Sequence, residues 1–180
     1  MIMRLYRLPP AQTISHKMIK VDHTGENGAV NIYRAQSLAA QLRARSLLPD
    51  LREFQDHEEH HRRLFAGYLR DNGIRRCISY HLCGAGGFAL GFVTGLIGPK
   101  AIFATTYAVE HVVLTHLEHQ MDYLKDRDSA AYNCVNEIVI DEREHHDTAE
   151  DQVDPNSALS RLLIRVVKAC TEAVIKFGMR

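Results

Sequence analysis

Residues 141–146 of the chain read DEREHH and place Glu142 three positions before His145. The stretch HEEHH repeats this spacing earlier in the chain with Glu58 and His61. Side chains three positions apart lie on the same side of an α-helix, one turn from each other. Each Glu-x-x-His unit can therefore direct one oxygen and one nitrogen ligand toward a common point beside its helix.

A lone glutamate precedes each unit at the same distance. Glu26, in VDHTGENGA, lies 32 residues before Glu58, and Glu110, in YAVEH, lies 32 residues before Glu142. Two such residues lie at the same height on neighbouring antiparallel helices if the chain reverses midway between them. Both midpoints are polar stretches that suit a turn. The repeat therefore predicts two helical hairpins whose ligands face inward.

Four inward glutamates and two Glu-x-x-His units are the ligand set of a carboxylate-bridged pair of iron or manganese ions in a four-helix bundle. Carboxylates supply hard anionic oxygens that bridge two cations, and each histidine supplies one nitrogen. The alternative is that these residues are solvated charges on helix surfaces. We take the paired spacing to favour the metal centre, and the predicted metal ligands, through which catalysis would occur, are Glu26, Glu58, His61, Glu110, Glu142 and His145.

Length and composition predict one domain over residues 1–180, of which residues 1–15 form a flexible N-terminus. Lysine and arginine balance aspartate and glutamate at 22 each, so no overall basic field favours nucleic acid as a partner. The four cysteines form no C-x-x-C pair, which excludes a rubredoxin-type iron site and suits reduced thiols.

Hydrophobic periodicity predicts an all-α fold without confident strands. The expected architecture is a four-helix bundle with two additional helices, a crossover and a C-terminal one, which form an apolar membrane-facing surface. The expected helices cover residues 16–44, 47–71, 77–99, 99–126, 129–152 and about 157–177.

Residues 77–99 contain no Lys, Arg, Asp or Glu. Gly87, Gly91 and Gly95 recur four apart and would form a small-residue stripe on one helical face. We expect a crossover helix that packs on the bundle through this stripe and exposes an apolar side to lipid. A wholly buried helix and a true membrane span are the alternatives.

Basic residues near both chain ends could meet lipid headgroups. Lys168 and Lys176 belong to the expected C-terminal helix and Arg180 follows it, and Arg4 and Arg7 lie in a segment without acids. A remnant of a targeting segment and a frayed, solvated terminus are the other interpretations of the N-terminal segment.

For several polar residues near the predicted ligands, the sequence allows more than one role. Asp22 could accept a hydrogen bond from a ligand histidine or join a surface ion pair. His57 and His60 are exposed or lie directly outside the ligands, and His116 and His119 are exposed or contact substrate.

With the ligands placed, the sequence resembles the demethoxyubiquinone hydroxylase family, the membrane-associated di-iron monooxygenases of ubiquinone biosynthesis. The resemblance rests on the Glu58–His61 unit and on three longer stretches that occur together in the family's order. These are VDHTGENGAVNIYRAQ at 21–36, GFALGFVTGLIGPKAIFATTYAVE at 87–110 and DEREHHDTAEDQ at 141–152. Position by position, the resemblance implies the six ligands given above, within a ferritin-like fold, and implies that Glu58 and Glu142 bridge the metals.

The chain departs from the family at two positions. Leu117 stands where the family tends to have tyrosine, and Thr171 stands where a basic residue is usual. The family associates these positions with quinone access and with proton or electron delivery, so the departures bear on substrate and efficiency.

The resemblance implies an O2-dependent monooxygenase that uses two iron ions, Fe2+/Fe3+, to hydroxylate the ring of a polyprenyl demethoxyubiquinol, with NADH or the quinol itself as reductant. The ring would enter from the membrane along an apolar channel, for which Tyr107, Val113, Leu114 and Leu117 are the candidate lining residues. The alternatives are a ferritin-like ferroxidase and a di-iron hydroxylase of another substrate.

The implied location is peripheral, on the cytoplasmic face of a bacterial cell membrane or the matrix face of the mitochondrial inner membrane. The expected partners are a lipid-presenting accessory protein of ubiquinone biosynthesis and further copies of the chain, with no nucleic acid.

Overall fold

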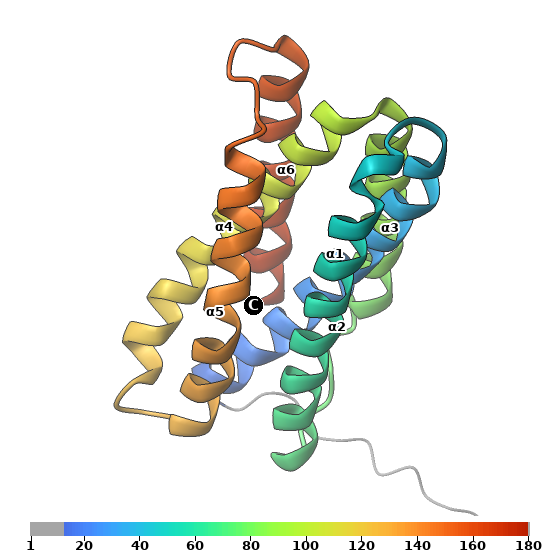
Figure 1. Cartoon of the computed structure of the whole chain (residues 1–180). Helices are drawn as coiled ribbons and strands as arrows, with labels where there is room; N and C mark the ends of the chain where they lie inside the picture. The colour runs from blue at the N-terminus through green and yellow to red at the C-terminus, as the bar shows by residue number, and fades with distance from the viewer. Residues whose placement is uncertain (1–12, 180) are drawn as a thin grey trace, which may run out of the picture.

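The computed structural model describes residues 13–179, and within this range the chain is helical without strands. Figure 1 shows six α-helices and the loops that join them. Their bounds are α1 Ile14–Arg43, α2 Leu48–Asp71, α3 Tyr80–Ile97, α4 Pro99–Leu124, α5 Ser129–Glu150 and α6 Ala158–Gly178, with a short 3-10 turn, η1, at Arg45–Leu47. The all-α prediction is confirmed, and each helix begins and ends within a few residues of its expected bounds.

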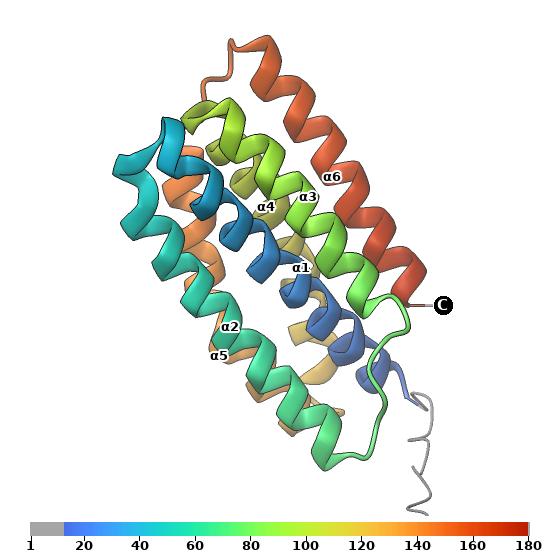
Figure 2. The same ribbon diagram turned by 90° about the vertical axis from the view of Figure 1, so that its right-hand side faces the viewer.

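Helices α1, α2, α4 and α5 form a ferritin-like four-helix bundle, in which α1 packs against α2 and α4 packs against α5. The α3 helix is the crossover between the two hairpins and lies along α1, as Figure 2 shows. The α6 helix returns along α4 on the same side of the bundle. The two additional helices therefore cover one side of the bundle, and neither of them packs on the opposite side.

Local sequence signals place the helix ends. Asp128 caps α5, because its side chain accepts a hydrogen bond from the backbone N–H of Ala131. Gly73 follows α2 with φ +64°, a left-handed conformation that costs glycine little. Pro99 opens α4, where its missing N–H would have no helical partner.

The α3 helix packs on α1 through its glycine face. A Cβ atom at Gly87 or Gly91 would collide with the backbone carbonyl of Gly28 or Ile32 on α1. The opposite face of α3 exposes large apolar side chains, namely Leu82, Phe88, Phe92, Val93, Leu96 and Ile97. The packed crossover with an apolar outer side is therefore confirmed, and the wholly buried alternative is wrong. Among the described helices, α3 alone has the length and composition to cross a membrane.

Two apolar clusters fill the bundle, one on each side of the acidic residues along the helix axes. The first includes Ile19, Phe65 and Leu124, and the second includes Tyr33 and Phe54. The candidate ligands on α1, α2 and α4 lie in sequence between the residues of the two clusters. The acidic centre is therefore enclosed at both ends by packed side chains.

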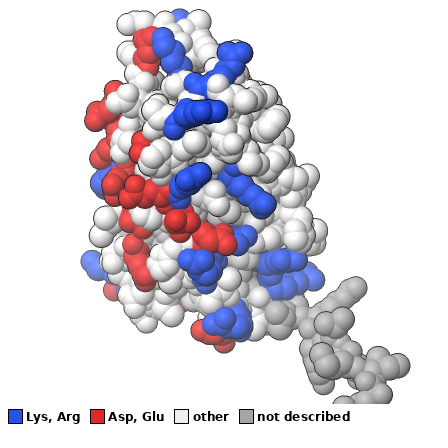
Figure 3. Space-filling view, turned by 45° about the vertical axis from the view of Figure 1, so that its right-hand side comes forward, with Lys and Arg blue, Asp and Glu red and all other residues white. Residues whose placement is uncertain are grey.

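Charges are unevenly spread although their sum is zero. In Figure 3, Asp and Glu gather along one flank, and the opposite edge of that face is largely uncharged. The four cysteines are free thiols. Arg4, Arg7, Arg180 and most of the expected flexible segment 1–15 lie outside the described residues, and the assignment of all 180 residues to one domain stays a prediction.

Candidate metal centre

The six predicted ligands meet in the middle of the bundle, and each of its four helices contributes. Each of the six residues has at most 5% of its surface exposed. Their ligand atoms form two groups, each within 4.8 Å, and both groups contain Glu58 and Glu142. Glu26 and His61 complete the first group, and the second is completed by Glu110 and His145. Two adjacent ion positions that share two glutamates are the arrangement expected of a carboxylate-bridged metal pair.

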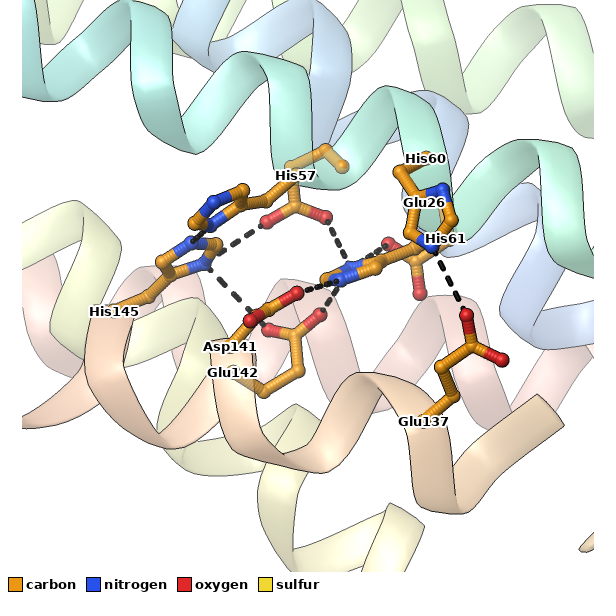
Figure 4. Close-up of polar contacts among 9 residues, drawn as sticks. Glu26, His57, His60, His61, Glu137, Asp141, Glu142 and His145 are labelled. Atoms are coloured by element: carbon orange, nitrogen blue, oxygen red, sulfur yellow. Dashed lines mark hydrogen bonds and ion pairs between the residues drawn. The ribbon is translucent and has the colours of Figure 1, made fainter. Parts of the chain in front are cut away.

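Each histidine faces the glutamate of the opposite Glu-x-x-His helix. Nδ1 of His61 on α2 lies 3.0 Å from Oε1 of Glu142 on α5 and 3.6 Å from Oε2 of Glu58. Nδ1 of His145 on α5 lies 3.2 Å from Oε1 of Glu58 on α2. Figure 4 shows both rings directed at the carboxylates between the two helices. The two units are thus related by an approximate two-fold axis.

The inward atoms form close ion pairs, but none of these contacts has hydrogen-bond geometry. Both carboxylate oxygens of Glu58 and of Glu142, and Nδ1 of His61 and His145, are buried without a hydrogen-bond partner. Leaving buried polar atoms unpaired costs about 1–3 kcal/mol each, and more for charged groups. Cations at the two positions would satisfy all of these atoms at once. The donor set of hard oxygens with one nitrogen per position fits iron or manganese.

Electrostatics also favour a cation here. Burial, with the nearby carboxylates of Glu58 and Glu142, holds the pKa of Glu26 well above its usual range. The pKa of Glu110 is raised well above its usual range by the same causes. Burial opposes the charged form of His61, but Glu142 and Glu58 outweigh it and raise its pKa to about 11. The interior therefore takes up positive charge, as protons when no metal is bound.

The outer nitrogens of the two candidate ligand histidines also have partners. Nε2 of His61 lies 3.1 Å from Oδ2 of Asp141, and Nε2 of His145 lies 3.1 Å from Nδ1 of His57. The hydroxyl of Tyr33 on α1 donates a 2.7 Å hydrogen bond to Oε1 of Glu110. Such partners fix ring orientation and keep Nδ1 turned toward a metal.

The structure shows the surroundings of the polar residues for which the sequence allowed two roles. His57 touches a ligand, whereas His60 is exposed and lies 3.2 Å from Glu137. Asp22 takes neither expected role among the described residues: its Oδ1 accepts a 2.9 Å hydrogen bond from Gln120, and its Oδ2 is buried without a hydrogen-bond partner. Burial raises the pKa of Asp22 to about 7, against the lowering effect of Gln120. His119 is exposed and His116 is half-buried.

An apolar cavity of about 630 Å³ reaches the acidic centre. Its walls come from α1, α3, α4 and α6, and Glu26, Glu58, Glu110 and Glu142 lie at its inner end. The exposed lining residues Leu82, on α3, and Val166, on α6, indicate that it opens between these two helices.

Two of the four candidate channel residues, Val113 and Leu117, line this cavity. Tyr107 and Leu114 do not, so those two predictions were wrong; Tyr107 instead packs against His111 and His146. Both positions at which the chain departs from the family resemblance, Leu117 and Thr171, are in the lining, as is His116.

Sequence reasoning missed the roles of Tyr33 and Asp141. A signal for Asp141 was present, because it directly precedes Glu142 just as His57 directly precedes Glu58. Applying the repeat to these positions would have found both outer partners. Nothing in the local sequence of Tyr33 points to Glu110, which lies 77 residues away.

Comparison with known proteins gives consistent matches. A family model described as "Ubiquinone biosynthesis protein COQ7" matches residues 13–178. The mouse NADPH-dependent 3-demethoxyubiquinone 3-hydroxylase, a mitochondrial protein, is 32% identical over 168 residues, which cover 91% of this chain and 76% of the relative. The 3-demethoxyubiquinol 3-hydroxylase of Rhodospirillum rubrum is 33% identical over 139 residues, covering 77% and 65%. The mitochondrial 5-demethoxyubiquinone hydroxylase of Saccharomyces cerevisiae is 32% identical over 148 residues, covering 74% and 64%.

Proposed function

The chain belongs to the ubiquinone biosynthesis protein COQ7 family, and from this premise we propose that it hydroxylates the ring of a polyprenyl demethoxyubiquinol. The mouse, bacterial and yeast relatives are all named as hydroxylases of such rings. Membership of the family gives the chain a role in ubiquinone biosynthesis, and the substrate and the cofactor are the finer parts of the proposal.

One observation carries the proposal furthest: the apolar cavity ends on the carboxylates of the candidate metal centre. A ferroxidase needs a polar route for hydrated iron, whereas a quinol ring with an apolar tail needs an apolar one. Leu82 and Leu90 on α3 and Val166 and Val174 on α6 provide such walls. The cavity therefore favours an apolar organic substrate over iron as cargo.

Two iron ions are the proposed cofactor. Glu26 and His61 would hold one ion and Glu110 and His145 the other, with Glu58 and Glu142 contributing to both positions. When bound, such a pair supplies redox equivalents to dioxygen, so that a ring carbon can gain an oxygen atom. Tyr33 holds the carboxylate of Glu110, and the packed clusters at both ends of the centre exclude water.

A reductant is needed because one atom of O2 enters the ring and the other leaves as water. The family resemblance implies NADH or the quinol itself as the reductant, and the name of the mouse relative specifies NADPH. We therefore propose a reduced nicotinamide as the electron source for this chain.

We further propose that the chain works at a membrane surface. The cavity opens between α3 and α6, and both helices expose apolar side chains to the outside, among them Phe92 and Leu96 on α3 and Leu162 on α6. A membrane-soluble tail could remain in lipid while the ring enters the cavity. We propose that the chain associates peripherally with a membrane through this surface, on the cytoplasmic face in a bacterium or on the matrix face in a mitochondrion. The proposed partners of the same surface are a lipid-presenting accessory protein and further copies of the chain.

A single-turnover assay tests the proposed reaction. The protein is loaded anaerobically with ferrous iron, mixed with short-tailed demethoxyubiquinol and exposed to 18O2, and the quinones are analysed by mass spectrometry. We expect a product carrying one 18O atom. A Glu142→Gln variant should form none, whereas Glu137→Gln, an exposed carboxylate on the same helix, should react like the wild type.

The outcomes separate the alternatives. Iron oxidation without a labelled quinone would reject the quinol hydroxylase and favour a ferroxidase or another substrate. A labelled product that forms equally well in the Glu142→Gln variant would reject the metal centre as the site of reaction.

A further inference from the structure

The two ligand histidines have outer partners of different chemistry. Nε2 of His61 lies 3.1 Å from a carboxylate oxygen of Asp141, whereas Nε2 of His145 lies 3.1 Å from Nδ1 of His57. Asp141 and His57 each directly precede the glutamate of their own Glu-x-x-His unit and reach across to the histidine of the other. The two contacts are therefore equivalent in position and differ in residue type.

The residue type changes how strongly each histidine binds a cation. An anionic carboxylate that accepts the Nε2 proton increases electron density on the ring and makes Nδ1 a better donor. An accepting imidazole is neutral and has a weaker effect. His61, with Asp141 as its partner, is therefore the stronger ligand, and His145 is the weaker.

Of the two glutamates that each belong to a single position, Glu110 is also a weaker donor than Glu26. Tyr33 donates a 2.7 Å hydrogen bond to Oε1 of Glu110, which withdraws negative charge from that oxygen. Among residues 13–179, no tyrosine hydroxyl bonds to Glu26. Both ligands of the position completed by Glu110 and His145 are thus poorer donors than those of the position completed by Glu26 and His61.

We propose that the two metal positions are unequal, with the ion held by Glu26 and His61 bound more tightly than the ion held by Glu110 and His145, and that His57 sets the difference. This inference rests on the proposed two-metal centre. Substitution of such outer partners typically changes metal affinity about 10- to 100-fold, and we expect a preference of this size. At substoichiometric metal, the protein would then carry a single ion on the Glu26 side.

Anomalous X-ray scattering from crystals grown with one equivalent of Mn2+ tests the proposal directly. We expect the anomalous density to lie mainly at the position between Glu26 and His61. In His57→Asp, His145 gains a carboxylate partner equivalent to the one that His61 already has in Asp141, and the preference for the Glu26 side should become clearly smaller. Asp141→Asn should also reduce the preference, by weakening His61.

His60→Asp is the matched control, because it makes the same substitution on the same helix at an exposed residue whose polar partner is Glu137; its ring contacts the His61 ring edge-on but makes no hydrogen bond to either ligand histidine. It should keep the wild-type preference. Circular dichroism of each metal-free variant checks that the helices have formed.

Equal density in the wild type, or a preference for the His145 side, would overturn the proposal. A His57→Asp variant that keeps the wild-type preference would overturn the role of His57. Absence of Mn2+ from both positions at two equivalents would contradict the metal centre of the proposed function, and this inference with it.

Discussion

Nδ1 of His61 on α2 lies 3.0 Å from Oε1 of Glu142 on α5, although neither atom takes part in a hydrogen bond. Two buried polar atoms this close, in an ion pair that lacks hydrogen-bond geometry, are positioned as two ligands of one cation would be. Several consequences of that geometry can be measured.

Metal should stabilise the fold, because it satisfies buried atoms that are otherwise unpaired. At a free Mn2+ concentration 100 times the dissociation constant, we expect unfolding to cost about 2.7 kcal/mol more than in chelator. Thermal unfolding with and without Mn2+ measures the effect. Glu137→Gln should retain it and Glu58→Gln should lose most of it, while identical melting curves for the wild type with Mn2+ and with chelator would argue against a metal centre.

The stabilisation by metal should increase with pH. Glu26 and Glu110 have pKa values well above the usual range, so the metal-free protein holds protons that a cation must displace. A carboxyl group with a raised folded-state pKa stabilises the metal-free fold at low pH, and this contribution is lost as pH rises. Metal-free protein should therefore become easier to unfold as pH increases above the ordinary glutamate pKa of about 4.5, while Mn2+ affinity rises.

Calorimetric titration with Mn2+ in buffers of different ionisation enthalpy measures this proton release. A binding enthalpy that is independent of the buffer would show that no protons are displaced.

Because α1 and α3 are in close contact, replacing Gly91 with a residue that carries a Cβ atom should destabilise the fold. A Cβ atom there would collide with the backbone carbonyl of Ile32, which can move only if the helices separate. We expect Gly91→Ala to lower the free energy of unfolding by about 1–3 kcal/mol in urea denaturation. Gly86→Ala is the matched control: it lies on the same helix with nothing within 4 Å of its Cβ position. It should stabilise by up to about 1 kcal/mol through helix propensity.

Narrowing the cavity should impair turnover without disturbing metal binding. Gly25 lines the cavity beside Glu26, and no atom lies within 4 Å of its Cβ position. A leucine there would extend into the space proposed for the ring. We expect Gly25→Leu to reduce kcat/KM for short-tailed demethoxyubiquinol about 10- to 200-fold, with unchanged Mn2+ affinity.

Gly25→Ala adds little volume and should remain close to the wild type. Full activity in Gly25→Leu would show that the substrate does not use this cavity.

Much of the fold was predictable because its signals are local. A spacing of three places Glu58 and His61 on one side of α2 whatever surrounds that helix, and the repeated interval of 32 residues pairs α1 with α2 and α4 with α5. Gly73 and Pro99 mark helix ends through backbone preferences that act within a few residues.

The cavity was less predictable because its walls come from helices that are far apart in the sequence. Tyr107 and Leu114 shared the apolar pattern of Val113 and Leu117, yet only the latter two line it. Rotation of α4 against α1 and α6 decides which apolar residues face open space, and periodicity alone reports only that they are apolar.

The sequence by itself determined the helices, the six inward side chains and the family, since helical period and ligand spacing are properties of short segments. Only the tertiary structure decided which residues support the ligands: Asp141 beside His61, His57 beside His145, and Tyr33 on Glu110. These contacts join different helices, so they depend on how the helices pack and on the few tenths of an ångström that a hydrogen bond requires.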